Sequence, residues 1–252
     1  MPVATHRILI PRGLQGLDGL IAAHSTRLGG VSKGPYASLN LGLHTDDDPA
    51  AVDENRRRFF GDLGIEPGQV AGAYQVHGCQ VAEVERPGQL EGYDALVTDR
   101  PGVYLTVTVA DCTPILVADP VRRAVAAIHA GWRGTVAGIA GKALETMRDR
   151  FGTDPAACLA WIGPCIDACT FEVDADVADH FEGRFKKWDP ERKKFFVDLK
   201  AANRAQLLEA GLPPDRVEVS PLATVIQVDR FFSHRAEGGH TGRMLALIGW
   251  RS

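Results

Sequence analysis

The spacing of hydrophobic and polar residues along the chain predicts most of its regular structure. From 103 to 109, Val and Leu alternate with Tyr and Thr, and this period of two is typical of a half-buried strand. From 135 to 150, apolar residues recur at helical spacing, which predicts an amphipathic helix. Further strands are predicted at 70–76, 80–85, 95–98, 115–118, 124–128, 157–162 and 244–250, and further helices at 49–63 and 200–210.

The order of these elements favours a fold of the α+β class. Strands outnumber helices and occur in hairpin-length runs, which favours mixed sheets over a doubly wound parallel sheet. The chain shows no fixed-period repeat and no Pro/Gly/Ser-rich linker, so we expect residues 1–252 to form a single domain. A chain of 252 residues buries roughly 70% of its unfolded surface, which is enough for a core without disulfides.

The charge balance argues against the simplest nucleic-acid-binding functions. With 28 Lys and Arg against 32 Asp and Glu, the net charge of -4 leaves no basic footprint for nucleic acid or an anionic membrane. No stretch approaches the roughly 18 apolar residues of a membrane span, and the start does not read as a signal peptide. Five cysteines without a secretory signal predict thiols, metal ligands or a nucleophile rather than disulfides. We therefore expect a cytoplasmic protein that binds neither nucleic acid nor membrane.

Three polar segments each follow an apolar strand, namely YQVHG at 74–78, ADCTP at 110–114 and HAGWRGT at 129–135. This order predicts that His77, Cys112 and His129 emerge together at one edge of a sheet. Two imidazoles and a thiolate suit a borderline-soft ion, and catalytic zinc commonly has three protein ligands and one open position. A water molecule in that position has a near-neutral pKa and supplies hydroxide.

Two other roles for these residues stay open on spacing alone. The gaps of 35 and 17 residues lack the short paired spacing that makes a zinc prediction strong. His77 is then a turn residue, Cys112 a small buried hydrophobe and His129 a core residue. Alternatively, Cys112 is the nucleophile of a metal-free hydrolase, with His129 or His77 as its base.

Two residues near these segments are candidates for anion binding and proton transfer. Arg133 lies between Gly131 and Gly134 just before the predicted 135–150 helix. A helix N-terminus with an arginine suits a phosphate or carboxylate, although a tight turn with Arg133 in a surface ion pair fits equally. Asp111, beside Cys112, is a candidate general base or the partner of a liganding histidine, or else it caps a turn.

Three further polar residues are candidate substrate contacts. Arg27 and Asn40 belong to the Gly-rich segment STRLGGVSKGPYASLNLG at 25–42, which fits surface turns equally well. Gln75 lies in the YQVHG segment, two residues before His77, and completes the set.

Taken together, these segments resemble one known family over about residues 20–250. QVHG, ADCTP, HAGWRG, GPCI with FEV, FFSHR with TGRM, and the 25–42 segment resemble the purine nucleoside phosphorylase family. That family is also called the laccase-domain, multicopper polyphenol oxidoreductase or peptidoglycan editing factor family. HAGWRG together with ADC and VHG is a specific combination.

The resemblance implies a single-domain α/β/β/α fold with mixed sheets between helices, and a zinc ion held by His77, Cys112 and His129. It implies an enzyme that cleaves adenosine, inosine and methylthioadenosine with phosphate and that deaminates adenosine to inosine. Purine nucleoside and phosphate are then the expected partners of a monomer or weak dimer. We expect the catalytic residues to be Cys112, Asp111 and His129, and the substrate or phosphate contacts to be Arg27, Asn40, Gln75 and Arg133.

Two other functions remain as alternatives. Early members of the family were described as copper-dependent polyphenol oxidases, but the 8 histidines here are dispersed and only 3 methionines occur, which disfavours copper. The chain also fits a non-catalytic module that binds nucleosides or is associated with the cell wall.

The sequence departs from the family pattern at two places. The usual His-Gly-Phe before STR is Ala22-Ala23-His24 here. A Cys-Thr-Tyr-type segment is replaced by Ala223, Thr224 and Val225, with Ile226 where a second cysteine is common. The three predicted zinc ligands are all present, so we expect the chemistry to be retained and the changed loops to affect base preference.

Overall fold

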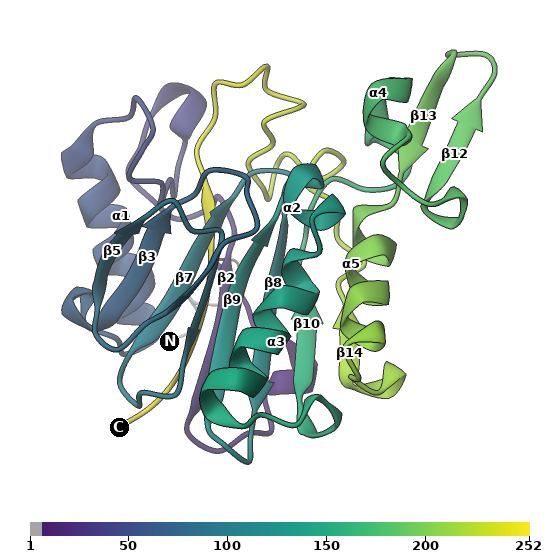
Figure 1. Cartoon of the computed structure of the whole chain (residues 1–252). Coiled ribbons are helices and arrows are strands. Elements are labelled where there is room, and N and C mark those ends of the chain that lie inside the picture. The colour runs from purple at the N-terminus through teal and green to yellow at the C-terminus, as the bar shows by residue number, and fades with distance from the viewer. Residues whose placement is uncertain (1–6) are drawn as a thin grey trace.

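Two six-stranded sheets form the centre of the computed structural model, which describes residues 7–252 (Figure 1). The first sheet has the strand order β1 (Ile8–Leu9), β2 (Leu20–Ser25), β15 (Met244–Trp250), β7 (Tyr104–Val109), β3 (Val70–Tyr74) and β5 (Gly88–Glu91). The second has the order β14 (Val217–Val219), β10 (Leu159–Ile162), β8 (Thr113–Asp119), β9 (Ala124–Ala130), β6 (Ala95–Thr98) and β4 (Val81–Glu83). Residues 1–6, which the predicted domain of residues 1–252 includes, lie outside the described residues.

The longer helices lie on the outer faces of these two sheets. Helix α1 (Pro49–Asp62) places Phe59 and Phe60 against the first sheet. Helices α3 (Ile139–Phe151) and α5 (Leu199–Glu209) cover the second sheet. Between the sheets, a further core joins Leu105 of β7 to Trp161 of β10. Both sheets mix parallel with antiparallel pairs, so the predicted α+β class with helices outside two mixed sheets is confirmed.

A third, smaller sheet projects from this body beyond one end of α5 (Figure 1). It consists of β11 (Glu172–Val173), β13 (Lys194–Val197) and β12 (Lys186–Asp189), with the short helix α4 (Ala175–Ala178) beside it. Short 3₁₀ turns cover Arg12–Leu14, Gly34–Tyr36, Pro67–Gln69, Pro155–Ala157, Gly183–Phe185 and Pro214–Arg216. Within residues 7–252, none of the helices has the length and apolar character that crossing a membrane requires.

The helix predicted at 135–150 is two helices in the structure. Helix α2 (Trp132–Val136) begins directly after Gly131, and α3 follows from Ile139. Gly138 separates them with a φ of 78°, a left-handed conformation that glycine adopts without strain and that interrupts the helix. Ile139 and Met147 in α3 face the second sheet, whereas Val136, which lies before the break and fits the same apolar spacing, is exposed. Periodicity alone therefore did not reveal the interruption.

The predicted strands agree with the structure to different degrees. The predictions at 95–98 and 244–250 coincide with β6 and β15, whereas the strand predicted at 80–85 is shortened to β4. The sequence did not predict β2 or the small third sheet. These segments lack a clear period of two; β2 pairs with the distant β15, whereas β12 and β13 form a local hairpin.

Strand β2 brings an unusual residue into the core. His24, at the position where the related family usually has Phe, is fully buried and meets the rings of Trp161 and Phe231 edge-on at 5.8 and 6.2 Å. Burial lowers the pKa of His24 to about 4 from an ordinary 6.5, with partial opposition from a backbone hydrogen bond at Ser25. The ring is therefore neutral and acts as an aromatic core residue near pH 7.

Replacing His24 with Phe should make the protein more resistant to acid. Because the pKa of His24 is lower in the folded state, the unfolded chain binds the proton first. His24 therefore reduces the free energy of unfolding by roughly 3 kcal/mol as the pH falls from 6.5 to 4. Urea denaturation should show that the free energy of unfolding decreases less between pH 7 and pH 4.5 in His24→Phe than in the wild type. The exposed His240 provides the control, and an equal loss for His24→Phe and His240→Phe would contradict the prediction.

Candidate metal centre

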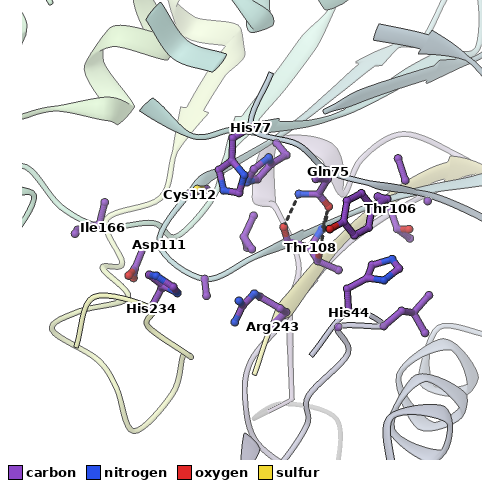
Figure 2. A pocket seen from close by; sticks show the side chains of 18 of the residues that line it. His44, Gln75, His77, Thr106, Thr108, Asp111, Cys112, Ile166, His234 and Arg243 are labelled. Carbon is purple, nitrogen blue, oxygen red and sulfur yellow. Dashed lines mark hydrogen bonds between the residues drawn. The ribbon is translucent and has the colours of Figure 1, made fainter. Parts of the chain in front are cut away.

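Three chain segments bring two histidines and one cysteine together at the ends of the central strands. His77 lies in the loop after β3, Cys112 in the turn between β7 and β8, and His129 near the end of β9. One ligand atom from each side chain lies within 4.8 Å of the other two. All three line a cavity of about 490 Å³, and Figure 2 shows His77 and Cys112 beside each other at its wall. The structure thus assembles the predicted ligand set from both sheets.

The local backbone allows this close approach. His77 has a φ of 59° and lies in the left-handed region, so the chain turns sharply after β3. Gly131, which follows the β9 strand, packs directly against the set. A Cβ atom there would lie 3.2 Å from Sγ of Cys112 and 3.2 Å from Cδ2 of His77. The glycine of the HAGWRGT segment therefore leaves room for the ligands, in addition to starting helix α2.

Asp94, a residue that the sequence analysis did not single out, holds two of these ligands in place. Its buried carboxylate accepts a hydrogen bond from Nδ1 of His129 at 2.8 Å and another from the backbone N–H of His77 at 2.9 Å. The backbone N–H groups of Val76 and Gly78 donate to the same carboxylate. Because Nδ1 of His129 is engaged, Nε2 remains available as a metal ligand.

The negative charge of the Cys112 thiolate and the positive charge of His129 stabilise each other. Burial opposes the charge of the Cys112 thiolate, but His129 and His77 outweigh it and lower the pKa of Cys112. Burial likewise opposes a charged His129, yet Cys112 and Asp94 together raise the pKa of His129. The thiol is therefore readily deprotonated, which is the form that binds a metal ion.

Asp111 occupies a different position from the one predicted for a partner of a liganding histidine. Its carboxylate accepts hydrogen bonds from Oγ1 of Thr224 at 2.6 Å, from Oγ of Ser233 at 3.1 Å and from the backbone N–H of Arg235 at 2.6 Å. The partner of His129 is Asp94 instead. Asp111 lines the cavity, but its two oxygens fasten the 224–235 segment to the β7–β8 turn (Figure 2).

Of the candidate substrate contacts, Gln75 lines the cavity. Its side chain pairs with the backbone of Thr108, donating from Nε2 to the carbonyl oxygen and accepting the N–H at Oε1, each at 2.8 Å (Figure 2). This pairing extends the contact between β3 and β7 beyond the end of β3. It ends the strand two residues before the predicted limit and fixes the start of the His77 loop.

Arg27 and Asn40 do not line the cavity and are engaged in structural contacts. The Arg27 guanidinium bonds the carbonyl oxygens of Ala37 and Val228 and forms an ion pair with Glu237 at 2.9 Å. Asn40 is fully buried, and its Oδ1 accepts the N–H of Gly42 and of Arg243. Asn40 thus acts on the cavity indirectly, because Gly42 and Arg243 belong to its lining.

Arg133 also lies outside the cavity lining. It is exposed at the start of α2, and its guanidinium lies 4.4 Å from the ring centre of Trp132. The helix places its apolar neighbour Trp132 toward the cavity instead. The sequence pattern identified a strand-to-helix turn correctly but could not show which residue faces inward.

Two arginines of the cavity, Arg56 on α1 and Arg243 just before β15, were missed by the sequence analysis. Arg243 belongs to the TGRM segment and Arg56 to a run of three arginines on a predicted helix, where no spacing distinguishes an inward from an outward side chain. The two segments that depart from the family pattern, 22–24 and 223–226, contribute nothing to the cavity lining within the described residues.

Comparison with known proteins places the chain in a family. The sequence model of the family described as multi-copper polyphenol oxidoreductase laccase matches residues 21–251. The chain belongs to this family. A Deinococcus radiodurans protein named purine nucleoside phosphorylase is 44% identical to this chain, and the match covers 90% of this chain and 88% of the relative. Purine nucleoside phosphorylase YlmD from Geobacillus stearothermophilus is 39% identical, and the match covers 95% of this chain and 93% of the relative.

Solved structures of the laccase family share the fold. The crystal structure of the hypothetical protein YfiH from Bacillus licheniformis superposes with a TM-score of 0.93 at 33% identity, covering 98% of both chains. That of YlmD from Geobacillus stearothermophilus gives 0.89 at 38% identity, covering 94% of this chain and 93% of the other. The family name mentions several copper ions, yet among residues 7–252 His77, Cys112 and His129 are the one group of three or more His, Cys, Asp or Glu side chains placed to hold a metal.

Replacing Asp94 with Asn should weaken metal binding about 10-fold to 100-fold, because the carboxylate that orients His129 and the His77 loop is lost. Zinc affinity can be measured by competition with a chromophoric chelator. Asp119 provides a matched control, since it is also fully buried and its carboxylate accepts the backbone N–H groups of Val121 and Arg122 far from the metal centre. Equal zinc affinity in Asp94→Asn and Asp119→Asn would contradict this role.

Proposed function

We propose that this protein is a zinc-dependent purine nucleoside phosphorylase that cleaves adenosine, inosine and methylthioadenosine with phosphate, and that also deaminates adenosine. One observation carries the proposal: a set of two imidazoles and one thiolate opens into a single cavity of about 490 Å³. That volume is within the range of small-molecule sites. The printed names of the relatives, purine nucleoside phosphorylase, support the substrate class.

The chemistry of the donor set fits zinc. Two histidines and one cysteine supply three ligands, which is typical of zinc sites that keep a position open for substrate or water. Zinc, when bound there, supplies a Lewis acid next to the substrate. His77, Cys112 and His129 would hold it. Copper fits less well, because a multicopper enzyme needs several metal sites and residues 7–252 bring together one such set.

The walls of the cavity suit a nucleoside. Ile166, Phe171 and Leu199 present apolar surface from the side of the small sheet and α5, against which a planar purine can stack. The opposite wall carries the hydroxyl groups of Thr106 and Thr108 and the amide of Gln89, which suit the hydroxyl groups of a sugar. The pairing of Gln75 with Thr108 keeps this polar wall in place.

In phosphorolysis, a phosphate oxygen forms a bond to the anomeric carbon while the bond from that carbon to the purine nitrogen breaks. The electron pair leaves with the purine, which takes up a proton, and the products are the free base and ribose 1-phosphate. The protein must hold the phosphate, orient the sugar and exclude competing water. In deamination, water adds to the purine ring and ammonia leaves. We assign Asp111 the task of fixing the 224–235 segment at the cavity, since three donors already occupy its oxygens.

A metal-free cysteine hydrolase is the second candidate, and one arrangement favours it. Asp94 orients His129 through Nδ1, and His129 in turn interacts with the Cys112 thiol. This order of acid, base and nucleophile is the one that activates cysteine in hydrolases. The two candidates use the same three residues, but the thiolate is a metal ligand in the first and attacks the substrate in the second.

We also propose that the protein is a single-domain cytoplasmic enzyme, monomeric or weakly dimeric. The state of its thiols supports the compartment: Cys79, Cys112, Cys158, Cys165 and Cys169 are all free. Free thiols persist in reducing compartments.

Replacing Cys112 with Ala should abolish bound zinc and both activities, because the set loses its only anionic ligand. The exposed Cys169 lies outside the cavity lining, so Cys169→Ala should keep wild-type zinc content and rates. Metal content is measured on the purified variants, together with release of free base and of inosine from adenosine, with and without phosphate.

The same experiment separates the candidates. Adenine release that depends on phosphate and stops with a chelator supports the zinc phosphorylase. Activity that resists the chelator but is lost on alkylation with iodoacetamide would indicate the cysteine hydrolase. A zinc-loaded protein that binds nucleosides without turnover would indicate a binding module and refute both enzymes.

A further inference from the structure

Three arginines line the cavity, and two of them, Arg56 and Arg243, are half-buried, whereas Arg235 is exposed and donates to the carbonyl oxygen of Glu172. Arg56 and Arg243 each make hydrogen bonds to backbone carbonyl oxygens, and neither forms an ion pair with any residue of the described range. By contrast, the half-buried Arg27 and Arg7 form ion pairs with Glu237 and Asp62. A buried positive charge is costly unless an opposite charge lies near it. Among residues 7–252, neither arginine has a carboxylate in ion-pair contact.

Arg243 is held rigidly at the centre of the cavity wall. Its Nη1 donates to the carbonyl oxygens of Thr241 and Gly242, while no described residue accepts from Nε or Nη2. Gly42 makes room for it, because a Cβ atom there would lie 2.8 Å from Cγ of Arg243. Figure 2 shows its side chain directed into the cavity, between Asp111 and Thr108. The N–H groups at Nε and Nη2 of Arg243 therefore remain available to a ligand.

Arg56 reaches the same part of the cavity from helix α1. Its Nη1 donates to the carbonyl oxygen of Leu41 at 2.9 Å, and its guanidinium lies over the Phe60 ring. The backbone N–H of Leu41 in turn donates to the carbonyl oxygen of Arg243. One residue, Leu41, therefore links the two arginines. Burial lowers the pKa of Arg56 to about 10, with partial opposition from Asp53, so the side chain is charged at pH 7 and poorly solvated.

No carboxylate of the cavity lining forms an ion pair with these arginines, although the charges of Asp111 and Cys112 act on Arg243 and that of Asp53 acts on Arg56. Asp111 is the single carboxylate among the described lining residues, and Thr224, Ser233 and Arg235 occupy its oxygens. The Cys112 thiolate is matched by His129 and His77. The cavity is therefore suited to an anion from solution that pairs with Arg56 and Arg243.

We infer that Arg56 and Arg243 form the subsite for a phosphate group, in which their free guanidinium donors bind its oxygens beside the metal centre. The choice of phosphate among anions rests on the proposed phosphorylase function. The group has two possible sources with the same chemistry: inorganic phosphate as co-substrate, or the phosphate of a nucleotide. The subsite replaces the predicted roles of Arg133 and Arg27, which lie outside the cavity lining.

The arrangement explains how an anionic nucleophile is brought to a neutral sugar. The arginines approach from α1 and the start of β15, whereas the apolar residues Ile166, Phe171 and Leu199 approach from the other side of the cavity. A purine on the apolar side places its sugar between the base and the arginines. A phosphate held there is aligned with the bond that breaks, as an in-line displacement requires.

Calorimetric titration with inorganic phosphate tests the subsite in the absence of nucleoside. Arg56→Gln and Arg243→Gln should each weaken phosphate binding at least 10-fold, since each removes a charge-assisted contact. Arg56→Lys and Arg243→Lys keep the charge and should recover part of the affinity. Arg133→Gln, which removes an exposed arginine outside the cavity lining, should bind like the wild type. Unchanged zinc content and unfolding temperature show that each variant is folded.

A second titration, with adenosine monophosphate, distinguishes the sources of the phosphate group. Binding of inorganic phosphate that depends on both arginines supports a co-substrate site, and arginine-dependent binding of the nucleotide alone supports a nucleotide site. Wild-type affinity for both ligands in Arg56→Gln and Arg243→Gln overturns the inference. If phosphate-dependent turnover persists in that case, the proposed phosphorylase function still holds. Arginine-dependent binding without any turnover would instead refute the phosphorylase function and support the subsite.

Discussion

The carboxylate of Asp94 is the interaction on which the candidate site most depends. It joins the loop after β3, in the first sheet, to His129 on β9, in the second sheet, through four hydrogen bonds. The two sheets otherwise meet through an apolar core, which fixes their separation but does not orient polar side chains. The buried Asp94 carboxylate thus orients His129 and the His77 loop relative to each other, which the packing of the sheets alone does not do. Removing its charge would leave backbone N–H groups and an imidazole without a partner, which is costly inside a protein.

The electrostatics of the cavity follow from the same arrangement. Arg56, Arg235 and Arg243 line the cavity together with the set of His77, Cys112 and His129, which is suited to a cation. The protein supplies one negative group to the ligand set, the Cys112 thiolate, and holds Asp111 for a structural task. The remaining positive charge is then available to substrate. This distribution favours an anionic co-substrate and a neutral partner, which is what phosphorolysis of a nucleoside needs.

The sequence predicted the fold class and the clustering of His77, Cys112 and His129, because both depend on local patterns. The period of two located β7, and the polar residues after apolar strands located His77, Cys112 and His129. Asp94 escaped notice because its importance arises from a contact with His129, 35 residues away along the chain. For a related reason, the sequence did not show that Arg27 and Arg133 lie outside the cavity lining. Residue type and proximity to glycine do not show whether a long side chain turns toward the cavity, toward Glu237, or over Trp132.

The layout of the cavity also bears on how one site would serve the two reactions that we propose. Phosphorolysis requires an anion beside the anomeric carbon, and deamination requires an activated water beside the purine ring. The arginines and the metal ligands lie in different parts of one cavity, with Arg243 close enough to Cys112 for the charge of the thiolate to raise the pKa of the arginine against the effect of burial. A nucleoside that binds in two orientations brings first its sugar and then its base to the reactive groups. Different contacts hold the two groups: Leu41 bonds to Arg56, whereas Asp94 bonds to His129 and to the His77 backbone.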